Sequence, residues 1–200
     1  MKNTVAFLCG AALWFSTALP LRADIVLALN PAQQNALVGS QVNVALTISG
    51  LGSGTAPSLS TFDVDIVFDE GILSFASATF GDPVLGDQLD LSLFGNISSI
   101  DATLPGIVNL FELSLDPVST LNSLQAGNFT LATLTFKTLR VGTSPLGIVS
   151  TLGDANGDPL IPNTIQNGSA TVVPEPAAIS LLGIVAGVFV YRCRRMVKRT

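Results

Sequence analysis

The 200-residue sequence is 48% hydrophobic and 12% charged, and it contains no histidine, which excludes Ser-His-Asp, Cys-His and histidine-metal chemistry. From residue 24 to residue 176, fourteen acidic residues stand against only two basic ones, Lys137 and Arg140, which gives this stretch a net charge of −12. Such a surface repels phosphate backbones, so the composition predicts a non-enzymatic protein that needs no cofactor and does not bind nucleic acid.

The N-terminus has the pattern of a secretory signal peptide. Lys2 supplies a positive charge, and residues 5–19 form an uncharged apolar run of the length that such signals have. The small residue Ala23 precedes Asp24, and we expect cleavage between them because the first strand-like segment begins there. Cleavage at Ser16-Thr17-Ala18 and a retained membrane anchor are the alternatives.

Apolar and polar residues alternate in several segments between residues 24 and 173, and no helical period stands out. Gly, Pro, Asp and Asn separate nearly all of these segments, as turns require. About nine strands with one polar face each predict an all-β sandwich of two packed antiparallel sheets. The predicted strands are residues 25–29, 41–49, 61–68, 72–78, 89–94, 107–115, 128–138, 146–150 and 169–173.

The alternation also assigns side chains to faces. The strand at 61–68 places Asp63 and Asp65 on its polar face. The strand around Phe111 places this residue on the apolar face and Glu112 on the polar face. We therefore expect these carboxylates to lie in solvent.

A short loop has oxygen-bearing side chains at alternate positions. Asp154, Asn156 and Asp158 fit positions 1, 3 and 5 of an EF-hand calcium loop, but Pro159 replaces the glycine of position 6 and Ile165 the glutamate of position 12. An EF-hand is therefore excluded. A looser calcium site and a plain turn remain as the two interpretations.

Other carboxylates gather in two groups, which invites comparison with the acid and base of a glycosidase. They fall at alternating strand positions and in turns, so we interpret them as residues that keep the surface soluble. The groups are Asp63, Asp65, Asp69 and Glu70, and Asp82, Asp87 and Asp90.

Three features follow one another in the last 28 residues. The prolines of Pro174-Glu175-Pro176 hold an extended stretch, and an uncharged apolar segment then begins at Ala177 and ends at Tyr191. This segment predicts a transmembrane helix, although it is shorter than the about 20 residues that a bilayer needs, and a buried core helix is the alternative. The positive-inside rule places the basic tail in the cytoplasm and the acidic body outside. The basic residues of the tail are Arg192, Arg194, Arg195, Lys198 and Arg199.

This composite resembles the PEP-CTERM sorting signal of Gram-negative bacteria. The resemblance implies that an exosortase, a membrane-embedded enzyme similar to cysteine transpeptidases, recognises Pro174, Glu175 and Pro176 and cuts near them. It also implies an exported precursor that is anchored in the inner membrane with a periplasmic body and that later reaches the cell surface or the medium. The expected division is 1–23 signal peptide, 24–172 body and 173–200 sorting signal.

Four segments of the body resemble the cohesin family. Residues 62–73 resemble the cohesin strand pair in which an alternating strand ends in an acidic turn. Residues 127–137 resemble a late strand that opens with G-x-F and closes with F-K, and residues 167–173 resemble the closing N-G-x-x-x-V strand. Residues 38–44 supply the early strand. The resemblance implies a nine-stranded jelly-roll sandwich, also known from carbohydrate-binding modules, that binds rather than catalyses.

Two functions follow for the exported body. One is a non-catalytic protein of the surface or the extracellular matrix, and the other is a cohesin-like receptor for a dockerin-type or polysaccharide partner. Sugar binding commonly uses exposed Trp or Tyr, whereas the only such residues, Trp14 and Tyr191, lie outside the body. An enzymatic role is a distant third interpretation.

Overall fold

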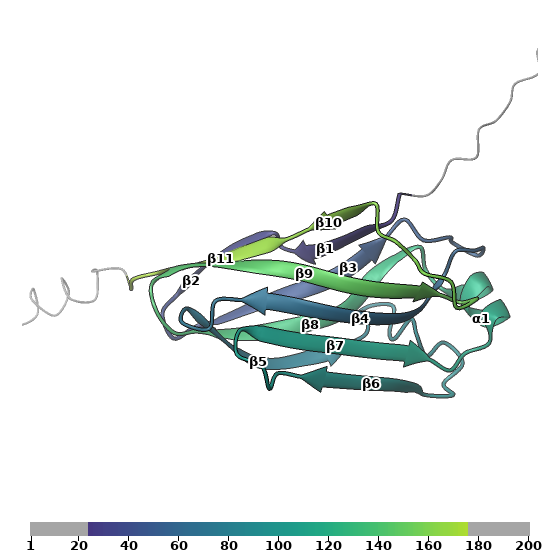
Figure 1. Cartoon of the computed structure of the whole chain (residues 1–200), viewed down its shortest axis with the longest axis horizontal. Helices are drawn as coiled ribbons and strands as arrows, with labels where there is room; N and C mark the ends of the chain where they lie inside the picture. Colours follow the sequence, from purple (N-terminus) through teal and green to yellow (C-terminus); the bar gives the residue numbers. More distant parts are fainter. Residues whose placement is uncertain (1–23, 176–200) are drawn as a thin grey trace, which may run out of the picture.

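The computed structural model describes residues 24–175 as two β-sheets packed face to face, with one short helix at one end (Figure 1). One sheet has five strands in the order β10-β1-β3-β8-β5, and the other has six in the order β2-β11-β9-β4-β7-β6. The strands are β1 Val26–Asn30, β2 Gln33–Leu37, β3 Gln41–Ser49, β4 Leu59–Phe68, β5 Leu73–Phe80, β6 Asn96–Asp101, β7 Ile107–Ser114, β8 Asn128–Thr138, β9 Gly142–Asp154, β10 Thr164–Gln166 and β11 Gly168–Val173, and the helix is α1 Val118–Leu124.

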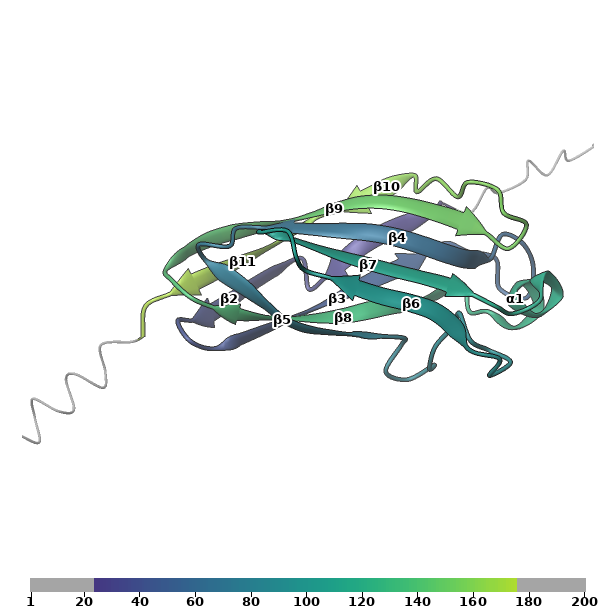
Figure 2. The same ribbon diagram turned by 60° about the horizontal axis from the view of Figure 1, so that its bottom comes forward.

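The predicted all-β sandwich is confirmed, with eleven strands in the described residues instead of about nine. Neighbouring strands pair antiparallel except for two parallel pairs, β1 with β10 and β2 with β11. β4 lies at the centre of the six-stranded sheet between β7 and β9. The sheets, seen from a second side in Figure 2, enclose one continuous layer of apolar side chains.

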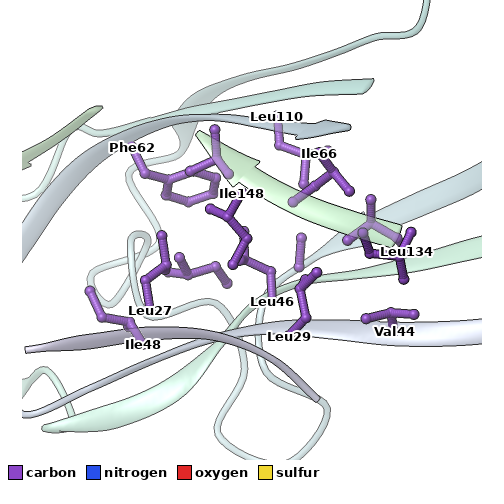
Figure 3. Packing of buried hydrophobic residues seen from close by; sticks show 14 of the residues in the cluster. Leu27, Leu29, Val44, Leu46, Ile48, Phe62, Ile66, Leu110, Leu134 and Ile148 are labelled. Carbon is purple, nitrogen blue, oxygen red and sulfur yellow. The ribbon is translucent and has the colours of Figure 1, made fainter. Parts of the chain in front are cut away.

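The core follows from the alternation of strand side chains. In β4, Phe62, Val64 and Ile66 are fully buried, while Asp63 on the other face is exposed. The inward side chains of the two sheets meet in Figure 3, which labels Phe62, Ile66, Leu110 and Ile148 from the six-stranded sheet and Leu27, Leu29, Val44, Leu46, Ile48 and Leu134 from the five-stranded one. Among residues 24–175 this cluster runs from Ile25 to Val172, so the described residues contain a continuous core of their own.

Three strands and the helix were not predicted from the sequence. β2 and β6 are the two edges of the six-stranded sheet, and their side chains lack the apolar alternation of a strand with one buried face. β10 has three residues, and α1 has two turns with only Leu121 buried. The strand predicted at residues 89–94 was wrong, because these residues form a loop before β6.

The face assignment in β7 was also wrong. Val108, Leu110 and Glu112 point into the sandwich and are buried, whereas Phe111 points out and is half-buried. Both faces of this strand carry apolar residues, so alternation alone does not determine which face is buried. The pairing of Leu110 with Val64 of β4 decides it, because residues opposite one another share a face.

The two ends of the sandwich differ in what they carry. α1 lies at one end, and β11 ends at Val173 at the other (Figure 1). Within residues 24–175, no helix is long and apolar enough to cross a membrane. The predicted signal peptide and the predicted transmembrane segment from Ala177 to Tyr191 lie outside the described residues.

Candidate binding face

The outer face of the six-stranded sheet places carboxylates beside apolar side chains. Asp65 of β4 lies opposite Val149 of β9 and Asn109 of β7, and Asp63 lies opposite Phe111 in the next row. β6 extends both rows, because its Asp101 lies opposite Asn109 and its Ser99 opposite Phe111. We call this surface the acidic sheet face and define it by Asp63, Asp65 and Val67 of β4, Ile107, Asn109 and Phe111 of β7, Ile97, Ser99 and Asp101 of β6, and Val149 and Thr151 of β9.

Asn109 holds the two central carboxylates in place. Its Nδ2 atom donates to Oδ1 of Asp63 at 2.6 Å and to Oδ1 of Asp65 at 2.8 Å. Both hydrogens of the amide are thereby used. The Oδ2 atoms of Asp63 and Asp65 receive no hydrogen bond from residues 24–175, so each carboxylate keeps an acceptor for a donor on another molecule.

Apolar side chains surround this pair. Val149 is 61% exposed, Ile97 53% and Val67 40%, and all three belong to the same face. Fixed hydrogen-bond acceptors beside exposed apolar side chains offer a partner both polar and apolar contacts. The predicted outward position of Asp63 and Asp65 is confirmed.

Glu112 does not lie in solvent as predicted, because it is only 1% exposed. Its Oε1 atom accepts a hydrogen bond from Nδ2 of Asn96, which also donates to Oδ2 of Asp87 at 2.6 Å. Burial raises the pKa of Glu112 to about 9, and the carboxylates of Asp87 and Asp90 add to the shift. Glu112 is therefore protonated at neutral pH and too buried to meet a substrate.

The carboxylates predicted to serve solubility at Asp82, Asp87 and Asp90 instead build a loop. Asp82 accepts hydrogen bonds from the backbone N–H groups of Val84, Leu85 and Thr130, at 2.8 to 3.0 Å. These hydrogen bonds lower the pKa of Asp82 to about 2, and the bond from Leu85 contributes most to the shift. A carboxylate in a turn finds unpaired backbone N–H groups within its reach, and these three aspartates therefore act within the loop.

The calcium-like loop follows β9 and closes on itself. Oδ1 of Asp154 accepts hydrogen bonds from the backbone N–H groups of Asn156 at 2.8 Å and Asp158 at 2.9 Å. This is the geometry of an Asx turn. Across residues 24–175, no group of three Cys, Asp or Glu side chains is placed to hold a metal ion.

The described residues include part of the predicted processing sites. Asp24 is the first of them, and Pro174 and Glu175 are exposed directly after β11. Ala23 and Pro176 lie outside, as do the basic residues Arg192, Arg194, Arg195, Lys198 and Arg199.

The sequence matches no protein-family profile and no curated protein. Its structure is similar to cohesin modules. A cohesin from Clostridium acetobutylicum shares 19% identity at a TM-score of 0.57, over 76% of this chain and 92% of that one. The sixth cohesin of scaffoldin B from Acetivibrio cellulolyticus, solved with a Cel5 dockerin, shares 17% identity at a TM-score of 0.56, over 75% and 98%. A cohesin from Clostridium thermocellum in a type I cohesin-dockerin complex shares 13% identity at 0.57, over 74% and 99%. The body therefore has a cohesin-like fold.

Proposed function

We propose that residues 24–175 form a non-catalytic binding module that recognises a dockerin-type protein partner through the acidic sheet face. The observation that carries this proposal is the pair Asp63 and Asp65, which Asn109 fixes among exposed apolar residues. The cohesin-like fold supports it, since two of the similar structures were solved as cohesin-dockerin complexes. The partner would supply hydroxyl, ammonium or guanidinium donors for the carboxylates and an apolar surface for Val149 and Ile97.

A polysaccharide partner is the weaker candidate. Sugar rings commonly stack on exposed aromatic side chains, and residues 24–175 contain neither Trp nor Tyr. On the acidic sheet face the one aromatic residue is Phe111, which is half-buried. The face offers little area for stacking, so the proposal names a protein.

The test is capture of a partner by immobilised residues 24–175 from the culture supernatant of the producing organism. Asp65→Lys reverses a charge in the middle of the face and should abolish capture. Asp158→Lys makes the same change on an exposed loop after β9, outside the face, and should leave capture intact. Equal capture by both variants would show that the partner binds elsewhere, and a captured glycan would favour the polysaccharide candidate.

We further propose that the module is exported and sorted by an exosortase. The support is the order of Pro174-Glu175-Pro176, the apolar segment from Ala177 to Tyr191 and the basic tail. In this proposal the precursor sits in the inner membrane with its body in the periplasm and is then processed to the cell surface or the medium. The exposure of Pro174 and Glu175 directly after the last strand leaves them accessible to a protease.

Processing is tested in a host that carries an exosortase. The double variant Pro174→Ala with Glu175→Ala should stay at precursor size and remain in the membrane fraction. Pro162→Ala, which changes a proline in the loop before β10, is the control and should be processed normally. Normal size and release of the double variant would contradict the sorting proposal and leave the binding proposal untouched.

A further inference from the structure

A second exposed apolar surface lies at the end of the sandwich that carries α1. Three side chains of the loop between β5 and β6 stand out in solvent, with Val84 88% exposed, Leu93 86% and Phe94 69%. We call this surface the apolar cap and define it by Val84, Leu85, Leu93 and Phe94 of the loop and Leu115, Val118 and Leu124 of the α1 segment. None of these residues belongs to the acidic sheet face.

The two parts of the cap are joined by hydrogen bonds. Asp116, at the start of the α1 segment, accepts from the backbone N–H of Leu91 at 2.6 Å and of Ser92 at 3.1 Å. At the other end of α1, Nε2 of Gln125 donates to the carbonyl of Gln88 at 3.0 Å. The loop therefore lies against the α1 segment along its length, and Figure 2 shows both at the same end of the molecule.

The loop between β5 and β6 is ordered by one buried side chain and by hydrogen bonds to its own aspartates. Leu89 is 1% exposed, and Oδ1 of Asp87 accepts from its backbone N–H at 2.9 Å. Oδ1 of Asp90 accepts from the backbone N–H of Gly95 at 2.9 Å, which closes the tip around Leu93. A surface that is already ordered loses little conformational entropy when a partner covers it.

Leu93 is held in a conformation that leucine rarely adopts. Its φ is +57°, and it is the only non-glycine residue of 24–175 with a positive φ. Hydrogen bonds hold the chain on both sides of it, at Ser92 through Asp116 and at Gly95 through Asp90. The loop thus keeps an unfavourable backbone geometry that points a large apolar side chain into solvent.

Charge indicates what can cover the cap. Asp82, Asp87, Asp90 and Asp116 all lie in or beside it. The only basic residues of 24–175 lie at the far end of β8, which begins beside α1 and runs away from it: Lys137 is near the end of the strand and Arg140 follows it. A second copy of this chain would bring like charges together, so the acidic cap favours a partner of opposite charge.

We propose that the apolar cap binds a basic amphipathic segment of a partner protein, with leucine-like side chains against Leu93 and Phe94 and lysine or arginine beside the carboxylates. The cap lies at the end opposite to Val173, so a chain tethered beyond Glu175 presents it away from the membrane (Figure 1). The apolar cap and the acidic sheet face are separate surfaces. If the cap does not bind such a segment, the proposed function of the acidic sheet face is unaffected.

The test uses residues 24–175, which contain their own core and no tryptophan. Phe94→Trp places a fluorophore in the cap, and Leu37→Trp places one at the end of β2, outside both binding surfaces, as the control. The probe is a 14-residue helical peptide of leucine and lysine, with a leucine-glutamate peptide of the same pattern as its counterpart. The leucine-lysine peptide should shift the emission of Phe94→Trp to shorter wavelength, saturably and less strongly at high salt, and should leave Leu37→Trp unchanged.

Leu93→Gly is the decisive variant. Glycine adopts a positive φ without strain, so the loop keeps its shape while one apolar side chain is lost. Binding measured by calorimetry should weaken about tenfold, as expected when one buried leucine is removed. Unchanged affinity of Leu93→Gly, equal binding of the glutamate peptide, or an equal shift in Leu37→Trp would overturn the proposal. Concentration-dependent self-association that Leu93→Gly abolishes would also overturn it and assign the cap to a second copy.

Discussion

The carboxyl groups of Glu112 and Asp87 are joined through one amide, since Nδ2 of Asn96 donates to both. One of the two is buried and protonated, and the other belongs to the loop that carries the apolar cap. This pair links the core of the sandwich to the loop between β5 and β6. Because Glu112 is protonated only in the folded state at neutral pH, the stability of the fold depends on pH.

We expect the free energy of unfolding to fall as pH rises from about 4.5 to about 9. The pKa of Glu112 is raised from its ordinary 4.5 to about 9 in the folded state, so between these values the unfolded chain loses a proton that the folded chain keeps. Glu112→Gln keeps the shape and cannot ionise, and it should therefore be more stable than wild type by about 4–5 kcal/mol at pH 8 and similar at pH 4. Urea unfolding at both pH values measures this, and parallel pH profiles of the two proteins would contradict it.

Asp82 should act with the opposite sign. Its pKa is lowered from 3.8 to about 2, so its contribution to stability is present above pH 3.8 and is lost as pH falls toward 2. Asp82→Ala leaves the N–H groups of Val84, Leu85 and Thr130 without their acceptor and should cost about 1–2 kcal/mol at neutral pH. Thermal unfolding at pH 7 and pH 2 should show the difference shrinking at the lower pH. If Asp82→Ala is destabilised equally at both pH values, the ionised carboxylate of Asp82 does not cause the loss of stability.

Gln125 should be the most sensitive polar residue of the fold. It is 2% exposed, its Oε1 accepts from the backbone N–H of Leu59 at 2.7 Å, and its Nε2 donates to the carbonyl of Leu59 at 2.8 Å and to that of Gln88 at 3.0 Å. Gln125→Leu leaves three buried backbone groups unpaired and should cost about 3 kcal/mol or more. Ser123→Ala, on the exposed face of α1, is the control and should cost less than about 1 kcal/mol in the same denaturant titration.

Core packing should dominate the remaining stability. Phe62 is fully buried and its ring lies 6.0 Å from that of Phe80, so Phe62→Ala should cost about 3–5 kcal/mol. Phe68 is only half-buried, although its ring meets that of Phe136 at 5.1 Å, and Phe68→Ala should cost less than Phe62→Ala. Equal losses in the two variants would contradict the packing described for β4.

Calcium should not stabilise the module. The Oδ1 atom of Asp154 is engaged by two backbone N–H groups of its own turn. Asp154→Ala should therefore cost about 1 kcal/mol or less, as for a surface turn. A rise of several degrees in melting temperature on adding calcium to residues 24–175, lost in Asp154→Ala, would reveal a site that the turn geometry conceals.

The sequence allowed the sandwich to be predicted where one face of a strand is apolar and the other polar. β4 is such a strand, and its alternation correctly placed both Phe62 in the core and Asp63 outside. β7 is apolar on both faces, so its phase, and with it the burial of Glu112, depends on pairing with β4. The acidic sheet face was therefore predicted only in its carboxylates. The apolar cap was not predicted, because hydrogen bonds from backbone N–H groups to Asp82 and Asp116 hold its loop in place and leave no periodic pattern in the sequence.

The position of β11 has a mechanical consequence for a tethered protein. This last strand lies between β2 and β9 and pairs with both, and the chain leaves it along the strand direction at Val173. A pull transmitted through Glu175 thus acts parallel to the strand and loads both rows of backbone hydrogen bonds in shear. These bonds must break together instead of one after another, so in the proposed membrane-anchored precursor this strand would resist traction from a partner held at the far end.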